Sequence, residues 1–268
     1  MIREPVVSGR FYPADAHELS KQVETFAAGN GVQKIAARGC IVPHAGYMYS
    51  GHVAGAVYKA LQMPRRFILL GPRHYPRGEA LAILSDGAWL TPLGEAKIDT
   101  ALAMELKRAC PILREDAVAH RSEHALEVQL PFLQRLAPGF TFVPVALGTD
   151  RFAALEELGR AVSEVVAAQA EPVLVIASSD MNHYESDDIT RAKDGKAIDR
   201  ILALDARGLY DTVRREGITM CGFGPAVALL RAARGLGAKR ADLVRYATSG
   251  DITGEFDEVV GYAGIIIQ

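Results

Sequence analysis

Apolar residues along the chain gather into short runs that turn-forming and polar residues separate. Apolar runs of four to nine residues are typical of strands that are buried on both faces of a sheet. The pattern therefore predicts seven strands, over residues 39–43, 67–70, 81–84, 140–147, 173–177, 242–247 and 259–267.

Alanine-rich or amphipathic segments lie between these runs, with apolar residues at helical spacing. They predict helices over residues 51–62, 100–110, 123–136, 151–169, 187–204 and 224–234. Pro131 falls inside the third of these segments. Since proline has no backbone N–H, it predicts a kink or a new first turn at that point.

The alternation of strands and helices predicts an α/β fold with a central, mostly parallel or mixed β-sheet flanked by helices. The sequence has no internal repeat, no low-complexity tract and no linker-like segment, so residues 1–268 are expected to form a single domain. In sheets of this kind, ligands bind in the crevice beyond the carboxyl ends of the strands. Candidate functional residues are therefore sought where strands end.

Three of the predicted strands end in turns that carry histidine. "CIVPHAGY" supplies His44, "FILLGPRHY" supplies His74, and "VLVIASSDMNHY" supplies Asp180 and His183. If these strands are parallel neighbours, their ends meet at one edge of the sheet and the histidines converge. Glycines beside His44 and His74 permit the tight turns that this arrangement needs.

Cys221 is a further candidate, because "TMCGFGP" places it just before a predicted helix. A helix N-terminus favours the thiolate form, which is both a nucleophile and a soft metal ligand. Cys40, inside a predicted strand, and Cys110, at a helix end, are expected to fill the core. His124 in "RSEHALEVQLP" is expected at the start of a helix, with a capping or a catalytic role.

Two imidazoles and a thiolate would form a three-ligand metal site with open positions. Such a donor set suits iron, copper or zinc better than magnesium or calcium. Cys221 is the expected third ligand and Asp180 the alternative, while Asp180 could otherwise orient a histidine. His183 could then act as a general acid or base. The same residues also allow a metal-free thiol enzyme, in which Cys221 is the nucleophile and His183 the base.

Composition narrows the function classes. The 268 residues carry a formal net charge of −2, and no basic block is present, which argues against nucleic-acid binding. No apolar run reaches the roughly 18 residues that a membrane helix requires, and the first residues lack the layout of a signal peptide. Three scattered cysteines do not form a disulfide framework. A cytoplasmic location is therefore expected.

The motifs "VSGRFYP", "VPHAGYMYSG", "GPRHY", "EHALEVQLPFL", "SSDMNHY" and "MCGFGPA" together resemble the MEMO family, whose microbial members are labelled AmmeMemoRadiSam system protein B. The resemblance covers essentially the whole chain. It implies a fold related to the class III (LigB-type) extradiol dioxygenases. It also implies metal binding by His44, His74 and Cys221, with Asp180, His183 and His124 beside the metal.

In the extradiol dioxygenases the third ligand is a glutamate, whereas this chain has Cys221 at the matching position. The resemblance therefore implies a redox protein of unknown substrate, with a dioxygenase-like metal site that holds non-heme iron or copper, or else zinc. It further implies AMMECR-type and radical-SAM proteins as partners. A non-catalytic module that holds a peptide or small molecule in the cleft is the third alternative.

Overall fold

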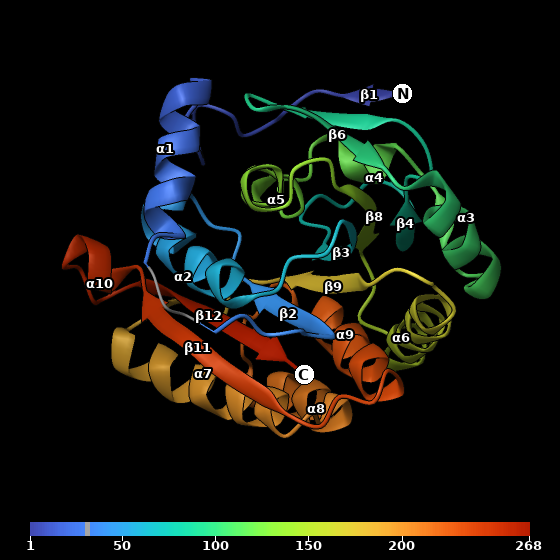
Figure 1. Ribbon diagram of the computed structural model, residues 1–268. Coiled ribbons are helices and arrows are strands. Elements are labelled where there is room, and N and C mark those ends of the chain that lie inside the picture. Colours follow the sequence, from blue (N-terminus) through green and yellow to red (C-terminus); the bar gives the residue numbers. More distant parts are fainter. Residues whose placement is uncertain (30–32) are drawn as a thin grey trace.

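The computed structural model describes residues 1–29 and 33–268. Four parallel strands form the centre of its sheet, in the order β8 (Thr141–Leu147), β3 (Arg66–Pro72), β9 (Val173–Ser178) and β2 (Gly39–Val42). All residues of β2 and β9 are buried. The apolar runs therefore form strands covered on both faces, as the sequence predicts. The three histidine-bearing turns follow adjacent parallel strands, β3, β9 and β2 (Figure 1).

The outer strands make the sheet mixed. Next to β2 lies the antiparallel β12, which also pairs with β11 and β10; beyond β8 lie β6, β5 and β1, and β4 and β7 branch from β8. Twelve strands are paired within the described residues. The outer ones are β1 (Ile2–Arg3), β4 (Leu81–Ile83), β5 (Ala88–Thr91), β6 (Gly94–Ile98), β7 (Arg114–Glu115), β10 (His183–Glu185), β11 (Ala241–Thr248) and β12 (Val259–Ile267).

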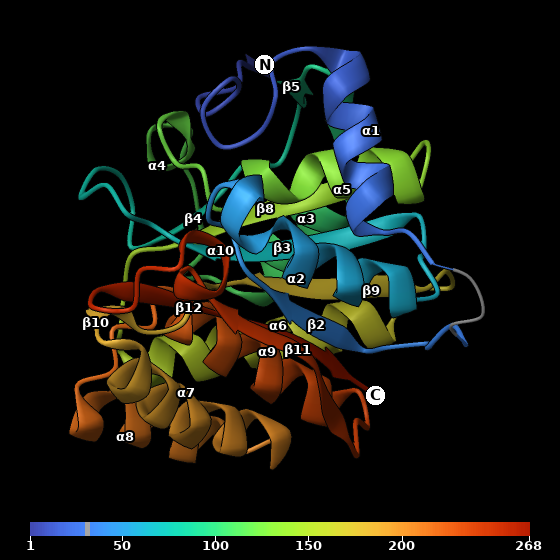
Figure 2. The ribbon, with the colours of Figure 1, turned by 90° about the vertical axis from the view of Figure 1, so that its left-hand side faces the viewer.

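Helices cover both faces of the sheet (Figure 2). Because successive strand residues point to opposite faces, Ile68 and Leu70 pack with one set of helices, and Phe67 and Leu69 with the other. The first set comprises α3 (Thr100–Ala109), α6 (Phe152–Ala167), α7 (Asp187–Leu202), α8 (Ala206–Glu216) and α9 (Phe223–Gly235). The second comprises α1 (Ala16–Phe26), α2 (Tyr47–Ala60) and α5 (Leu130–Leu136). No helix among the described residues combines the length and apolarity that crossing a membrane needs.

The predicted α/β class is confirmed, and the architecture is consistent with the fold that the resemblance implies. Cys40 and Cys110 are buried in the core as expected. The sequence pattern missed α1, α8 and several outer strands, which are short or amphipathic without a continuous apolar run. The short helices α4 (Val118–Arg121) and α10 (Gly250–Thr253) were missed as well.

The predicted helix over residues 123–136 is wrong in its first part. Residues 122–126 form an irregular turn, followed by the 3-10 helix η1 (Glu127–Gln129) and by α5. The carboxylate of Glu123 accepts the backbone N–H groups of His124 and Ala125 at 2.8 and 2.9 Å, which stabilises the turn instead of a helix. Ser122 follows α4 and caps no helix start. Pro131 lies in the first turn of α5, as its lack of an N–H predicts.

Candidate metal centre

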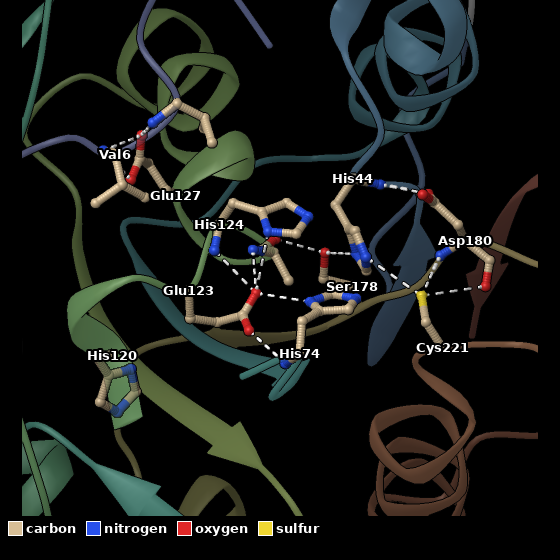
Figure 3. A network of polar contacts seen from close by, with 12 residues as sticks. Val6, His44, His74, His120, Glu123, His124, Glu127, Ser178, Asp180 and Cys221 are labelled. Atoms are coloured by element: carbon tan, nitrogen blue, oxygen red, sulfur yellow. Dashed lines mark hydrogen bonds and ion pairs between the residues drawn. The ribbon is translucent and has the colours of Figure 1, made fainter. Parts of the chain in front are cut away.

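His44, His74 and Cys221 converge at the carboxyl edge of the central strands. One ligand atom of each lies within 4.8 Å of the other two, and Cys221 Sγ is 3.3 Å from His44 Nε2. Figure 3 shows both rings beside the sulfur atom. Metal–nitrogen and metal–sulfur bonds of about 2.0–2.3 Å would set the ligand atoms roughly 3.3–3.8 Å apart. The three side chains therefore fit a metal ion after small shifts.

His44 follows β2 and is fully buried. Its Nδ1 lies 2.9 Å from Ser178 Oγ, and its backbone N–H donates to Asp180 Oδ1 at 2.7 Å. Burial, and secondarily the nearby His74, lower the pKa of His44 to about 3. The ring is therefore neutral at physiological pH, which is the form that binds metals.

His74 follows β3 and is fixed by Glu123. The Glu123 carboxylate accepts the backbone N–H of His74 at 2.6 Å and contacts its Nδ1 at 2.9 Å. Burial alone would raise the pKa of Glu123, but the hydrogen bonds from His74 outweigh it and lower the pKa to about 2. Burial likewise acts to lower the pKa of His74, and Glu123 overrides it, so that the pKa is raised. With Nδ1 engaged, the Nε2 of His74 is left for a metal, as in carboxylate–histidine–metal triads.

Cys221 lies two residues before α9, as the sequence predicts. Its Sγ accepts the backbone N–H of Asp180 at 3.3 Å. Burial, and then the charge of Asp180, raise the pKa of the Cys221 thiol well above its usual range. The expected stabilisation of the thiolate by the helix N-terminus is thus outweighed by desolvation. A metal cation bound to the sulfur would reverse that balance.

Asp180 follows β9 and contacts the turn after β2. Its Oδ1 accepts the backbone N–H groups of His44 and Ala45 at 2.7 and 3.3 Å, while no hydrogen bond joins it to an imidazole among the described residues. Burial raises the pKa of Asp180. Asp180 therefore holds the backbone of the turn that presents His44, and orients this histidine through its main chain.

His183 lies in β10, and Thr219 fixes its ring. The Thr219 carbonyl lies 3.0 Å from His183 Nδ1, and the Thr219 hydroxyl accepts the His183 backbone N–H at 2.8 Å. A carbonyl oxygen can only accept, so Nδ1 carries a hydrogen. The Nε2 of His183 makes no hydrogen bond with another of the described residues.

His124 stacks on His74, with ring centroids 4.6 Å apart, and meets His44 edge to face at 5.5 Å. Phe11 packs against its other side at 4.9 Å. Burial, and then His44, lower the pKa of His124 to about 4. His124 therefore lies among the candidate ligands, but in a turn instead of at the predicted helix start.

A second possible ligand group consists of His74, Glu123 and His124. It suits a metal less well, because the Glu123 carboxylate already accepts three backbone N–H groups and contacts the His74 ring. Its oxygen lone pairs are therefore largely engaged. The group of His44, His74 and Cys221 keeps its nitrogen and sulfur lone pairs available.

Sequence reasoning missed the residues that support the ligands. Neighbouring residues on the predicted helix would face apart, yet in the turn that forms instead, Glu123 contacts both His74 and His124. Ser178 and Gln129 are fully buried. They lie within the quoted motifs "SSDMNHY" and "EHALEVQLPFL", but the residue pattern alone gives neither of them a role.

The N-terminal segment packs over this cluster. Glu127 is fully buried, and its carboxylate accepts hydrogen bonds from Arg3, from Tyr12 and from the backbone of Val6 and Val7. Arg3 also donates to the carbonyl of Glu123 at 2.6 Å. The segment is thereby tied to the turn that carries Glu123, and Figure 3 shows the contact between Val6 and Glu127.

A pocket of about 350 Å³ lies beside His74 and Cys221. Arg73, Thr149 and the first residues of α9 complete its lining. A larger cavity of about 810 Å³ opens at the opposite edge of the sheet and is lined by residues 36–38 and 171–174, among others. None of the candidate ligands lines the larger cavity, whereas His74 and Cys221 line the smaller pocket.

Comparisons with known proteins identify the family. The family model described as "Memo-like protein" matches residues 3–266. A MEMO1 family protein of Methanopyrus kandleri is 42% identical and aligns over 100% of this chain and 99% of its own length. One of Methanothermobacter thermautotrophicus is 40% identical, over 98% and 99%. The crystal structure of an uncharacterized protein of Escherichia coli K12 has a TM-score of 0.53 at 11% identity, covers 84% of this chain and 98% of its own, and shows the fold alone. The chain belongs to the Memo-like protein family.

Proposed function

We propose that this protein binds a redox-active metal ion, iron or copper, through His44, His74 and Cys221, and uses it in an oxidation–reduction reaction on a small molecule. The observation that carries the proposal is the convergence of the two histidines and the thiol within 4.8 Å. Both Nδ1 atoms are engaged by Ser178 and Glu123, which leaves both Nε2 atoms as ligands. Two imidazoles and a thiolate suit iron, copper or zinc.

The residues around the ligands have separable roles in this proposal. A bound iron or copper ion would supply the electron-transfer chemistry that protein side chains lack. Glu123 fixes the ring of His74, and Asp180 holds the turn that presents His44. His183 presents a free Nε2, which suits it to take a proton from a substrate.

The geometry favours a metal centre over a metal-free thiol enzyme. A nucleophilic cysteine needs a thiolate, whereas burial raises the pKa of Cys221. The base of a catalytic triad is oriented by a third group, but the Nδ1 of His183 faces the carbonyl of Thr219 and not Asp180. In the alternative thiol mechanism, Cys221 would therefore not be activated as a thiolate, and no carboxylate would orient the base His183.

The resemblance to AmmeMemoRadiSam system protein B leaves further predictions in place. It predicts AMMECR-type and radical-SAM protein partners, and the pocket beside Cys221 has room for a small molecule or for one side chain of a peptide. A cytoplasmic location is predicted as well. A pull-down from the native host, with the metal-loaded protein as bait, tests the partner prediction.

Metal analysis tests the main proposal. The wild type and His44→Ala are purified without oxygen from cells supplied with iron, copper and zinc, and their metal content is measured by mass spectrometry. About one metal ion per chain is expected in the wild type and almost none in the variant. Cys40→Ala serves as a control, because Cys40 is buried in β2 and belongs to neither possible ligand group. Equal metal content in the wild type and His44→Ala would refute the centre.

A further inference from the structure

A chain of buried hydrogen bonds leads from Tyr58 to the ring of His44. The hydroxyl of Tyr58 contacts Gln129 Oε1 at 2.8 Å, and Gln129 Nε2 contacts Ser178 Oγ at 2.9 Å. Ser178 Oγ in turn lies 2.9 Å from His44 Nδ1. All four side chains are at most 1% exposed. Since water does not reach them, each hydrogen must be assigned within the chain itself.

A backbone carbonyl fixes the orientation of the Gln129 amide. One end of the amide lies 2.9 Å from the carbonyl oxygen of Pro43. A carbonyl oxygen only accepts, so the NH₂ group must face it, and Oε1 must face the hydroxyl of Tyr58. The second hydrogen of the NH₂ group then points to Ser178 Oγ.

A second backbone carbonyl fixes the hydrogen of Ser178. The Ser178 hydroxyl lies 2.7 Å from the carbonyl oxygen of Ala125, which can also only accept. The single hydroxyl hydrogen is therefore donated to Ala125. Because its only hydrogen is donated to Ala125, Ser178 Oγ can only accept from His44, as it does from Gln129.

We infer that Ser178 is a positioning residue that holds neutral His44 with its hydrogen on Nδ1, so that the lone pair of Nε2 points toward Cys221. Two backbone carbonyls set the direction of these hydrogen bonds. Pro43 orients the amide of Gln129, and Ala125 takes the hydroxyl hydrogen of Ser178. The ring of His44 is thus oriented as a metal ligand before any metal binds. That consequence for metal binding rests on the proposed function, whereas the position of the hydrogen does not.

Nuclear magnetic resonance of the metal-free, ¹⁵N-labelled full chain tests the inference. Long-range ¹H–¹⁵N correlation distinguishes a ring nitrogen that carries hydrogen from one that does not, and the signals of His44 are assigned by their loss in His44→Gln. The wild type is expected to show hydrogen on Nδ1 and none on Nε2. Hydrogen on Nε2 in the wild type would overturn the inference.

Three variants separate a positioning role from a merely structural one. Ser178→Ala removes the acceptor of Nδ1 and is expected to give mixed tautomers. Gln129→Met removes a donor to Ser178 Oγ but leaves Ala125 to take the hydroxyl hydrogen, and Tyr58→Phe removes another buried hydrogen bond of the same chain. Both are expected to keep the single tautomer of the wild type. A single wild-type tautomer in folded Ser178→Ala would refute the inference.

Cobalt(II) titration, followed by absorption, adds a second measurement. Loss of a group that supports a metal ligand typically weakens metal affinity about 10- to 100-fold. Ser178→Ala is expected to show a loss of that size, and Tyr58→Phe to bind as the wild type does. If the wild type takes up no metal while its His44 carries hydrogen on Nδ1, the metal centre fails and the tautomer assignment stands. Unchanged affinity in a Ser178→Ala protein with mixed tautomers would show that the tautomer does not govern binding.

Discussion

Glu123 contacts His74 twice, accepting its backbone N–H at 2.6 Å and lying 2.9 Å from its Nδ1. One carboxylate thus fixes both the main chain and the ring of a candidate metal ligand. The same group accepts the N–H of His124 and Ala125, which closes its own turn. The turn that carries Glu123 and the end of β3 are therefore held together by a single buried charge.

The first prediction concerns Glu123→Gln. The amide keeps the size of the side chain, but its NH₂ group would face one of the N–H groups that the carboxylate accepts. The amide also carries no charge to hold the ring of His74. Metal affinity is expected to fall about 10- to 100-fold, and the free energy of unfolding by about 1–3 kcal/mol. Cobalt titration and urea unfolding measure the two effects. Glu115→Gln, which removes a carboxylate paired with Lys107 away from the ligands, is the control, and equal affinity in both variants would contradict the prediction.

The second prediction distinguishes the two possible ligand groups. Cys221→Ala removes a ligand of the proposed centre, whereas His124→Ala removes one of the alternative group formed with His74 and Glu123. Cys221→Ala is expected to abolish stoichiometric metal binding, and His124→Ala to keep about one ion per chain. Metal analysis of both proteins decides, and the reverse result would assign the metal to the alternative group.

The placement of the candidate ligands can be predicted from the sequence because it depends on short-range patterns. Apolar runs identified β2, β3 and β9, and parallel pairing brings the turns after them to one edge, including those of His44 and His74. The sequence pattern also located Cys221 before α9. Each of these inferences needed only the residues next to a strand or helix end and the general rule for parallel sheets.

The supporting residues could not be predicted, because their contacts join distant parts of the chain. Arg3 and Glu127 are 124 positions apart, and neither stands in a regular pattern. Gln129 appeared to be one polar residue of an amphipathic helix, yet its amide reaches Pro43 and Ser178. Glu123 was misplaced because the helix assigned to its segment would have turned it away from His124. Such contacts follow from the three-dimensional arrangement, and local periodicity does not encode them.

The third prediction concerns Gly222, the residue after Cys221. A Cβ there would lie 2.4 Å from the carbonyl oxygen of Ser178 and 2.5 Å from Ser179 Cβ. Gly222→Ala must therefore displace the Cys221 loop from the end of β9. Overpacking of this kind costs about 1–3 kcal/mol of stability, and metal affinity is expected to fall together with it.

Gly224→Ala is the matched control for Gly222→Ala. A Cβ at Gly224 would meet its nearest neighbour, Leu155, at 3.4 Å, which is close to ordinary contact. Stability and metal affinity are expected to stay near those of the wild type in this variant. If Gly222→Ala bound cobalt as tightly as Gly224→Ala, close packing of the loop on β9 would not be what positions Cys221.

The fourth prediction concerns the pH dependence of stability through Asp194. This fully buried carboxyl contacts Asn182 N–H and Tyr246 Oη, and burial raises its pKa to about 6 despite these hydrogen bonds and the nearby Arg191. Because the folded chain holds the proton more tightly than the unfolded chain, its stabilising effect is complete below about pH 4 and is lost as the pH rises through about 6. Between pH 4.5 and 7.5 the wild type should therefore lose about 2 kcal/mol relative to Asp194→Asn. Urea unfolding at both pH values measures this difference in the free energy of unfolding, with Asp257→Asn as an exposed control. A difference between the wild type and Asp194→Asn that does not change with pH would show that Asp194 is ionised at pH 4.5 in the folded chain.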